Sequence, residues 1–292
     1  MSPTESELLY TSYHPLLFSL AYRMLGSVQD TEDLLQDVFI TFSETETGNI
    51  QNKKAYLCKM VTNRCIDLLK SASKQREQYT GTWLPEPLIT ENSPGGDPAG
   101  QVFLKESVSM AYLLLLQQLS ETERAVFILK EVLQYSYEEI AEIVGKSSTN
   151  CRQLFSRAKR SIVPPEEEPK MTQKGKLLAE QFFGALASGD TSKLLSLLSA
   201  DASLLTDGGG KVKAAIFPIL GAERITRFYM GILSKLPQNM TYSFNFINGE
   251  PGLILYAGKQ VYAALSLHIE GNKIQTIYSV MNPEKLTHIT LN

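Results

Sequence analysis

Residues 135–162 read YSYEEIAEIVGKSSTNCRQLFSRAKRSI, and this stretch is the most informative in the chain. Apolar residues at helical spacing run from Ile140 to Val144 and stop at Gly145, and a second helical stripe follows at Leu154, Phe155 and Ala158. Two short helices separated by a glycine turn predict a helix-turn-helix. In that motif the second helix lies in the major groove, and its early residues meet base edges.

The charges of this stretch are segregated across the turn. Acidic residues 138, 139 and 142 precede the turn, whereas only basic charges follow it. A helix that touches phosphates needs cations, and the helix before it does not. A solvated helical hairpin with a cationic C-terminal turn is the alternative, because the helix dipole favours that arrangement too. The predicted DNA-reading residues are Lys146, Ser148, Asn150, Arg152, Gln153, Ser156, Arg157, Lys159 and Arg160.

A second candidate for DNA contact lies upstream, in residues 59–77 (KMVTNRCIDLLKSASKQRE). Basic side chains share one polar side of a predicted helix, and an aromatic residue just before it could stack on an unpaired base. An ordinary mixed-charge solvated face is the alternative. The candidate residues are Tyr56, Asn63, Arg64, Asp67, Lys70, Lys74 and Arg76.

An acidic helix is predicted at residues 30–42, DTEDLLQDVFITF. Its polar face cannot approach DNA, but it suits a basic protein surface. A solvated amphipathic helix is again the simpler alternative. The residues assigned to a protein partner are Asp30, Glu32, Asp33, Gln36, Asp37 and Phe39.

The overall charge argues against a self-sufficient DNA-binding protein. The 292 residues carry 28 Lys and Arg against 31 Asp and Glu, a net charge of −3. Residues 1–172 hold 17 basic and 23 acidic residues (−6), and residues 173–292 hold 11 and 8 (+3). Proteins that hold DNA alone are usually basic, because phosphate neutralisation supplies most of their affinity.

Composition also limits the class of protein. A hydrophobic fraction of 43% is that of a globular chain, and no apolar run approaches the roughly 18 residues of a membrane span. The N-terminus has no signal-peptide pattern, so a cytoplasmic protein is expected. Cys58, Cys65 and Cys151 form no C-x-x-C pair, and they are expected to be small buried residues. No metal or cofactor is predicted.

Residues 173–292 have a different pattern, that of an α+β domain. Helices are expected at 173–188, 191–198 and 222–236, and strands at 202–206, 241–247, 252–256, 260–269 and 273–280. A further apolar run occupies 212–217. These elements predict a curved antiparallel sheet packed against helices. Before them, the Pro- and Gly-rich stretch 81–100 reads as a linker, and Pro164–Glu168 (PPEEE) ends the helical part.

Taken together, these segments resemble an extracytoplasmic-function (ECF) sigma factor of the sigma-70 family. DTEDLLQDVF is similar to the part that binds the polymerase clamp, VTNRCIDLLKSASKQRE to the −10 helix, and residues 135–162 to the −35 helix-turn-helix. The resemblance implies two all-α domains followed by an NTF2-like, SnoaL-like α+β domain. Its implied boundaries are region 2 at 1–80, a linker at 81–106, region 4 at 107–163, a hinge at 164–172 and the SnoaL-like domain at 173–292.

Three short motifs narrow the resemblance to the group with a fused SnoaL-like domain. WLPEP lies in the linker, DGGGK follows the first strand and NPEKL follows the last. In that group the fused domain is understood to control activity. We expect the three motifs to pack together and to fix the placement of regions 2 and 4. Their residues are Trp83, Leu84, Pro85, Glu86, Pro87, Asp207, Gly208, Gly209, Gly210, Lys211, Asn282, Pro283, Glu284, Lys285 and Leu286.

The resemblance implies a bacterial RNA polymerase core and promoter DNA as partners, with the free protein a monomer. A sigma factor can be acidic, because polymerase supplies part of the positive channel. A one-component regulator that senses a small ligand is an alternative, but it leaves the acidic helix at 30–42 unexplained.

Enzymes of the ketosteroid-isomerase type share the NTF2-like fold and use an Asp base with an oxyanion donor. No such acid–base pair can be assigned from spacing, and no catalytic residue is predicted. The residues considered are Asp201, Asp207, Tyr229, Tyr242, Tyr256, Tyr262, Tyr278, His268 and His288. DGGGK is not a phosphate-binding loop either, since it lacks the G-x-x-x-x-G-K-[ST] spacing. Its glycines are expected to form a tight turn.

Overall fold

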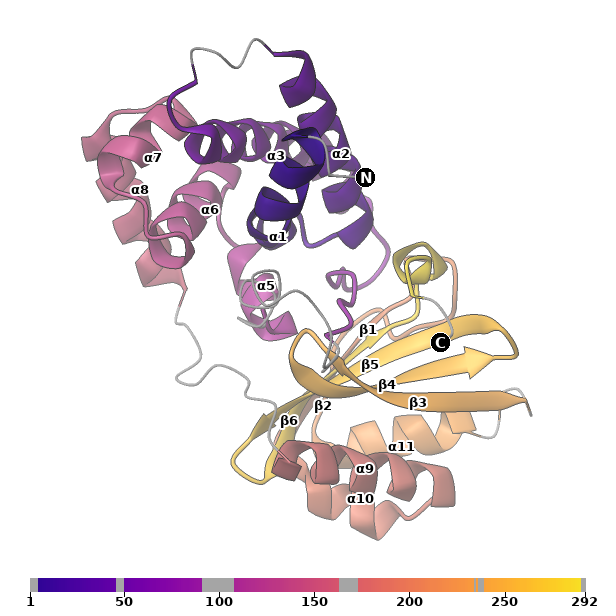
Figure 1. Ribbon diagram of the computed structural model, residues 1–292. Coiled ribbons are helices and arrows are strands. Elements are labelled where there is room, and N and C mark those ends of the chain that lie inside the picture. Colours follow the sequence, from indigo (N-terminus) through magenta and orange to yellow (C-terminus); the bar gives the residue numbers. More distant parts are fainter. Residues whose placement is uncertain are drawn as a thin grey trace. The chain divides into compact units, whose positions relative to one another are not determined.

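The computed structural model (Figure 1) describes residues 5–45, 50–90, 108–162, 173–233, 235 and 239–289, without the side chains of 5–7 and 73–77. The chain forms two compact units. Unit 1 contains Met1–Glu77, Ser93–Glu106 and Tyr112–Glu166, and unit 2 contains Gln78–Asn92, Ser107–Ala111 and Glu167–Asn292. The expected hinge at 164–172 and the linker residues 91–106 lie outside the described residues.

Three helices form the first part of unit 1: α1 (Glu5–Leu25), α2 (Val28–Glu44) and α3 (Lys53–Glu77). Ser27 begins α2, because its hydroxyl accepts the amide of Asp30 and so satisfies a free N–H of the first turn. The buried stripe of α2 includes Leu34, Leu35, Val38 and Phe42. These residues recur at helical spacing and form the inward face of this helix.

The second part of unit 1 comprises α5 (Met110–Leu116), α6 (Glu121–Phe127), a π-helical turn (Ile128–Val132), α7 (Tyr137–Val144) and α8 (Ser148–Ser161). Capping boxes at Ser120 with Glu123 and at Ser136 with Glu139 begin α6 and α7. Gly145 ends α7 with a left-handed φ of 65°. The helix-turn-helix predicted from the sequence is therefore formed by α7 and α8.

The two parts of unit 1 are joined by buried polar contacts. Arg124 on α6 donates to the carbonyl of Met24 at 2.6 Å and to that of Leu119 at 3.4 Å. The hydroxyl of Tyr135 donates to Cys58 Sγ on α3 at 3.4 Å. The stretches that resemble regions 2 and 4 thus lie in one compact unit. Cys58, Cys65 and Cys151 are all buried, as expected.

Unit 2 is built on a six-stranded sheet in the order β2-β1-β6-β5-β4-β3. Its helices are α9 (Gln173–Ser188), α10 (Thr191–Leu197) and α11 (Ala222–Leu233), and a 3₁₀ turn η3 spans Pro283–Leu286. The strands are β1 (Leu198–Asp207), β2 (Ile219–Leu220), β3 (Met240–Ile247), β4 (Glu250–Ala257), β5 (Gln260–Glu270) and β6 (Lys273–Val280). This is the α+β architecture, a sheet packed against helices, that the sequence predicted.

Two details of the sheet differ from the sequence prediction. Strands β1 and β6 pair in parallel, so the sheet is mixed rather than antiparallel. The connection after β1 contains α11, and a crossover of this kind permits parallel pairing. The apolar run 212–217 forms no strand, and Ile216 and Phe217 in it are exposed.

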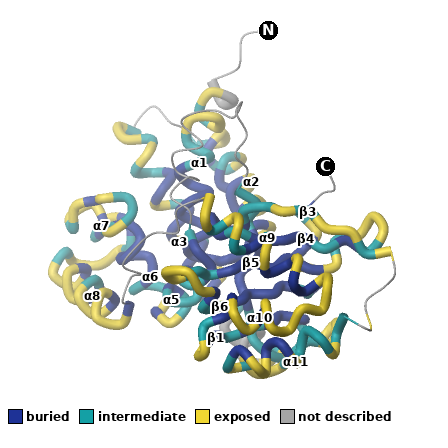
Figure 2. The backbone as a smooth tube through the Cα atoms, turned by 90° about the horizontal axis from the view of Figure 1, so that it is seen from below, coloured by how far each residue is buried: buried dark blue, intermediate teal, exposed yellow. Residues whose placement is uncertain are grey.

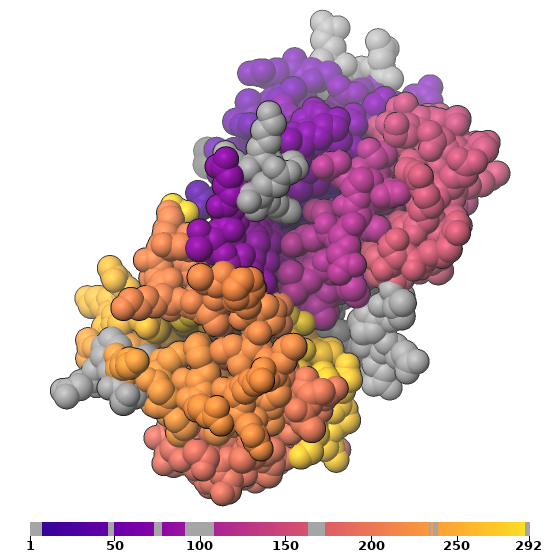
Figure 3. Space-filling view, turned by 180° about the vertical axis from the view of Figure 1, so that it is seen from behind, coloured from indigo at the N-terminus to yellow at the C-terminus, as the bar shows by residue number. Residues whose placement is uncertain are grey.

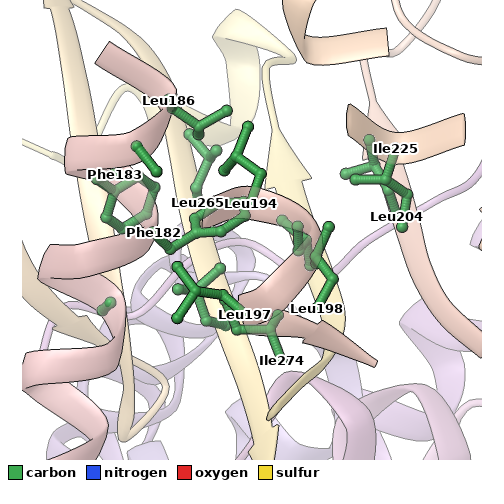
Figure 4. Packing of buried hydrophobic residues seen from close by; sticks show 14 of the residues in the cluster. Phe182, Phe183, Leu186, Leu194, Leu197, Leu198, Leu204, Ile225, Leu265 and Ile274 are labelled. Atoms are coloured by element: carbon green, nitrogen blue, oxygen red, sulfur yellow. The ribbon is translucent and has the colours of Figure 1, made fainter. Parts of the chain in front are cut away.

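The core of unit 2 lies between the sheet and the three helices. Figure 4 shows Phe182 and Leu186 of α9 and Leu194 of α10 near Leu265 of β5, and Ile225 of α11 beside Leu204 of β1. The buried residues are concentrated along the strands in Figure 2. One face of the sheet is therefore covered by these three helices.

The segment after α3 belongs to unit 2 and pairs with the edge of its sheet. The amide of Thr90 donates to the carbonyl of Phe246 at 2.9 Å, and the amide of Asn248 donates to that of Leu88 at 2.8 Å. Ile89 forms an antiparallel bridge with Ile247. Figure 3 shows purple atoms of the segment after α3 against the orange atoms of the sheet domain. We call residues 78–90 the captured linker. It occupies one end of edge strand β3, whose other neighbour is β4.

Candidate nucleic-acid interface and linker site

The predicted DNA-reading residues of α8 lie on its outward face. Cys151, Leu154 and Ala158 are buried and fix the orientation of the helix. Ser147 caps its start by accepting the amide of Asn150 at 3.2 Å. Ser148 is half-buried, and the exposed candidates are Lys146, Asn150, Arg152, Gln153, Ser156, Arg157, Lys159 and Arg160.

Three of these cations are paired with acids of unit 1. Arg152 lies 3.2 Å from Glu138, and Arg157 lies 3.2 Å from Glu123. Lys159 lies 3.7 Å from Glu131. Exposed pairs of this kind are worth roughly 0–1 kcal/mol, so phosphate groups can compete for the cations. The pairs explain how an acidic unit can still present a basic helix.

The second set of DNA candidates lies on α3. Asn63, Asp67 and Lys70 are exposed, and Lys70 is 3.6 Å from Asp67. Arg64 is half-buried instead, because it donates to the hydroxyl of Thr41 at 2.8 Å and lies 3.7 Å from Asp37. A residue predicted to contact DNA is thus paired with one predicted to contact a protein.

The remaining residues of the predicted α3 site are either half-buried or outside the described side chains. The ring of Tyr56 is half-buried, with its centroid 6.0 Å from that of Phe42. The side chains of Lys74 and Arg76 lie outside the described residues.

The acidic residues of α2 are presented to solvent. Asp30, Glu32, Asp33, Gln36 and Asp37 are exposed, whereas Phe39 is half-buried with its ring 4.8 Å from that of Tyr10. Glu32 also accepts from His14 at 3.1 Å. The surface is acidic and exposed, and its assignment to a basic protein partner stays a prediction.

In unit 2, Asp207 lies at the centre of the three short motifs. Its Oδ1 accepts the hydroxyl of Tyr79 at 2.5 Å and the amide of Gly209 at 3.0 Å. Its Oδ2 accepts the amide of Leu84 at 2.8 Å and the ammonium of Lys285 at 2.7 Å. Burial and the bond to Asp207 raise the pKa of Tyr79, so its hydroxyl stays protonated as the donor. One carboxylate therefore binds all three motifs.

Lys285 adds a second set of contacts to the captured linker. Its ammonium donates to the carbonyl of Leu84 at 2.5 Å and lies 3.8 Å from the Trp83 ring centroid and 5.0 Å from that of Tyr79. A cation over an aromatic face is stabilised by the ring quadrupole, more so when it is desolvated. Leu84 is fully buried while Trp83 is half-buried, so Leu84 rather than Trp83 is the buried apolar anchor.

Close packing explains two of the three glycines in DGGGK. Gly209 has φ +59°, and a Cβ there would lie 2.4 Å from Asn282 Nδ2. A Cβ on Gly208 would lie 2.5 Å from the carbonyl oxygen of Val212. The turn is thus shaped to admit Asn282 of NPEKL. At the outer end of both motifs, exposed Lys211 pairs with Glu284.

The remaining motif residues line the linker path. Pro85, Glu86 and Pro87 are buried, as is Leu286, whereas Gly210 and Pro283 are exposed. His288 Nε2 lies 2.8 Å from the carbonyl oxygen of Pro87. Tyr79, Asn248 and His288 were not assigned to this site from the sequence. Each is joined to the linker by contacts between residues far apart in sequence, which leave no local pattern.

The residues considered for an enzyme have different hydrogen-bond partners. Four donors bond to the Asp207 carboxylate. Asp201 is exposed and bonded to Ser199, and His268 lies between Glu250 and Glu270.

The described residues include no group of three or more His, Cys, Asp or Glu side chains placed to hold a metal ion. Within them, too, no helix is long and apolar enough to cross a membrane.

Comparison with known proteins agrees with this geometry. The sigma-70 region 2 family model matches residues 9–75, and the sigma-70 region 4 model matches residues 109–162. The chain is 30% identical over 287 residues to the ECF RNA polymerase sigma factor SigJ of Mycobacterium tuberculosis, covering 93% of this chain and 90% of that protein. The probable ECF sigma factor SigI of the same species is 28% identical over 283 residues, covering 95% and 93%. The crystal structure of SigJ superimposes with a TM-score of 0.76 at 24% identity, covering 96% of this chain and 98% of that one.

Matches to both sigma-70 regions define a promoter-recognition protein of the sigma-70 type. The chain belongs to the ECF sigma factors of the sigma-70 family, in a form that resembles SigJ over almost its whole length and carries a fused α+β domain. It is an RNA polymerase sigma factor.

Proposed function

We propose that this sigma factor directs a bacterial RNA polymerase core to its promoters through two DNA-reading helices, and that unit 2 controls it by holding the linker. Helix α8 reads the −35 element, and α3 contacts the −10 element. The observation that carries the first assignment is the outward face of α8. Its polar side chains are exposed while Cys151, Leu154 and Ala158 anchor the opposite face.

The acidic face of α2 is assigned to polymerase. Exposed carboxylates at Asp30, Asp33 and Asp37 complement a basic protein surface and repel DNA. Arg64 connects this face to the DNA-contacting helix, since it bonds Thr41 and lies near Asp37 while projecting from α3. Promoter contact by Arg64 therefore requires a change of partners.

The captured linker is the proposed regulatory element. It joins regions 2 and 4 in sequence, and its path is set by contacts with Asp207, Lys285, Asn248 and His288. A linker held at these points cannot follow a different path on polymerase. Release of the linker from unit 2 is therefore the step that we expect to control activity.

The first experiment separates a sigma factor from a self-sufficient regulator. Labelled promoter DNA is incubated with the full chain, with core polymerase and with both, and retardation and transcription are measured. We expect specific binding and transcription only when both are present. Strong sequence-specific binding by the chain alone, particularly as a dimer in size-exclusion chromatography with light scattering, would favour a one-component regulator.

The second experiment tests the linker, using a matched pair of lysines. K285M removes a buried ammonium that bonds the linker, and K211M removes an exposed one from the same cluster of motifs. We expect K285M, like deletion of residues 282–292, to change promoter-dependent transcription, and K211M to change it little. Equal transcription by wild type and K285M would remove the proposed role of the linker.

Trp83 gives a direct readout of linker release, because it is the only tryptophan in the chain. Its ring lies 3.8 Å from the Lys285 ammonium, so release of the linker should shift its emission toward longer wavelength. This signal distinguishes a released linker from a variant that transcribes differently for another reason.

The remaining assignments complete the proposal. The protein acts in the cytoplasm as a monomer when free, uses no cofactor and has no enzymatic activity. The occupied carboxylate of Asp207 supports the last point. Turnover of an isomerase-type substrate by the purified protein would contradict it.

A further inference from the structure

Arg152 is exposed, yet it is held on two sides. Its side chain is 57% accessible, and its Nη2 lies 3.2 Å from Glu138 Oε1. The carbon at the centre of its guanidinium lies 5.1 Å from the centroid of the Tyr137 ring. A carboxylate and an aromatic face thus restrict a side chain that normally samples many rotamers in solvent.

The Tyr137 ring is itself supported by the core of unit 1. Its centroid is 6.1 Å from that of Phe155, which meets it edge-on. Phe155 stacks in turn on Phe127 at 5.9 Å, and Phe127 is only 1% exposed. The backbone of Tyr137 is fixed as well, because it follows Ser136 in the capping box that begins α7. Arg152 therefore rests on a series of aromatic contacts that ends in the core.

The chemistry of the guanidinium makes this support significant. An arginine has five N–H donors in a planar fork, and it reads guanine by donating to O6 and N7 together. Glu138 engages one N–H of Nη2, and the second N–H of Nη2 can still form a two-point fork with a neighbouring guanidinium nitrogen. Lys159 also has an acid and a ring beside it, but an ammonium cannot make the planar two-point contact.

We propose that Tyr137 and Glu138 are positioning residues that hold Arg152 ready to read one base pair of the −35 element. This rests on the proposed function of Arg152 as a base-reading residue. Restraining the side chain before binding removes an ordering cost that would otherwise weaken the specific contact. The effect belongs to one base position, because Lys159, which also has an acid and a ring beside it, lacks the planar fork that reads a base at two points.

The alternative role for Glu138 is that of a brake, meaning a carboxylate that competes with DNA for the Arg152 guanidinium and so weakens DNA binding. The two roles have opposite consequences. A brake weakens binding to every sequence, so its removal would strengthen binding uniformly. A positioning residue strengthens one base preference, so its removal would relax that preference and leave the other positions unchanged.

The experiment is promoter selection with the full chain and core polymerase from DNA randomised across the −35 element. We expect R152A to lose preference at one position by roughly 5- to 150-fold. E138A and Y137L should relax the same position by roughly 2- to 10-fold, as expected for losing the restraint of one side chain. Y137F keeps the ring and should retain the preference, and E138Q, which keeps an acceptor, should be intermediate.

E142A is the matched control, because Glu142 is an exposed acid on the same helix with no role in the proposed arrangement. It should preserve the wild-type preference at all positions. Wild-type preference in both E138A and Y137L, or uniformly tighter binding by E138A, would overturn the positioning role. If R152A relaxes the preference at no position, the base-reading role of Arg152 is wrong. This result differs from one in which R152A relaxes a position while E138A and Y137L do not, which contradicts the positioning role alone.

Discussion

The ammonium of Lys285 lies 2.7 Å from Asp207 Oδ2, and their side chains are 8% and 0% exposed. Lys285 belongs to η3 and Asp207 to the end of β1, and both also bond the linker residue Leu84. Charges buried this deeply are costly unless every partner is present. The pair therefore stabilises the captured linker only as part of a complete network.

Removing one charge of this pair should destabilise unit 2 strongly. K285M leaves the Asp207 carboxylate buried without its cation, and D207N leaves the ammonium without its anion. Each variant should lose about 3–5 kcal/mol of unfolding free energy, as buried pairs do when one partner is removed. Urea titration followed by Trp83 fluorescence measures the loss at the site itself. The double variant should lose much less than the sum, and additive losses would show that the two groups act independently.

Gly209 should not tolerate a side chain. G209A places a Cβ against Asn282 at φ +59°, so we expect a loss of about 1–3 kcal/mol and a displaced NPEKL turn. G184A is the control, because Gly184 lies in α9 with nothing within 4 Å of the new methyl group. It should be neutral or stabilising by about 0.5–1 kcal/mol. Equal stability of the two variants would contradict the packing argument.

His268 should make the stability of unit 2 depend on pH. Its Nδ1 lies 2.7 Å from the buried carboxylate of Glu250, and this hydrogen bond, reinforced by Glu270, raises the pKa of His268. A raised pKa in the folded state stabilises it below the unfolded value of about 6.5, and the contribution is lost as pH rises through the folded pKa.

The comparison that tests this is wild type against H268Q. The stability advantage of the wild type should be larger at pH 6 than at pH 9, measured by urea unfolding at each pH. An advantage that stays constant, or grows at pH 9, would show that His268 contributes in its neutral form only.

Arg124 should be required for the compactness of unit 1. Its hydrogen bonds to the carbonyls of Met24 and Leu119 are buried, and R124A should lose roughly 1.5–3 kcal/mol. Amide hydrogen exchange should rise at the end of α1 and at the start of α6. R160A is the control, since the bonds of Arg160 stay within α8 and its loss should cost under about 0.5 kcal/mol.

Local patterns in the sequence were sufficient to predict most elements of both units. Apolar spacing predicts α2 and α8, and the serine and glutamate pairs predict where α6 and α7 begin. The start of β1 was less predictable, because its register shifts between Leu198 and Ser203 and interrupts the alternation. Periodicity depends on regular backbone, so it fails where a strand is irregular.

Contacts between distant residues could not be predicted in the same way. Parallel pairing of β1 with β6 is decided by the path of the intervening chain, not by the composition of either strand. The pairing of Arg64 with Asp37 depends on how α2 and α3 pack. The bonds that Tyr79 and His288 make to the linker site join residues more than 120 positions apart. Only the three short motifs indicated which distant segments belong together.

The captured linker also has a consequence for how the protein is made. Pro87 is bonded to a residue 201 positions later in the chain, and Tyr79 to one 203 positions later. At about 5–20 residues per second, a ribosome needs roughly 10–40 s to synthesise that interval. Region 2 is already synthesised when this interval begins, and region 4 is synthesised during it. The residues that hold the linker are synthesised only at its end. Every newly made molecule therefore passes through an interval in which the linker lacks its contacts with Asn282 and His288.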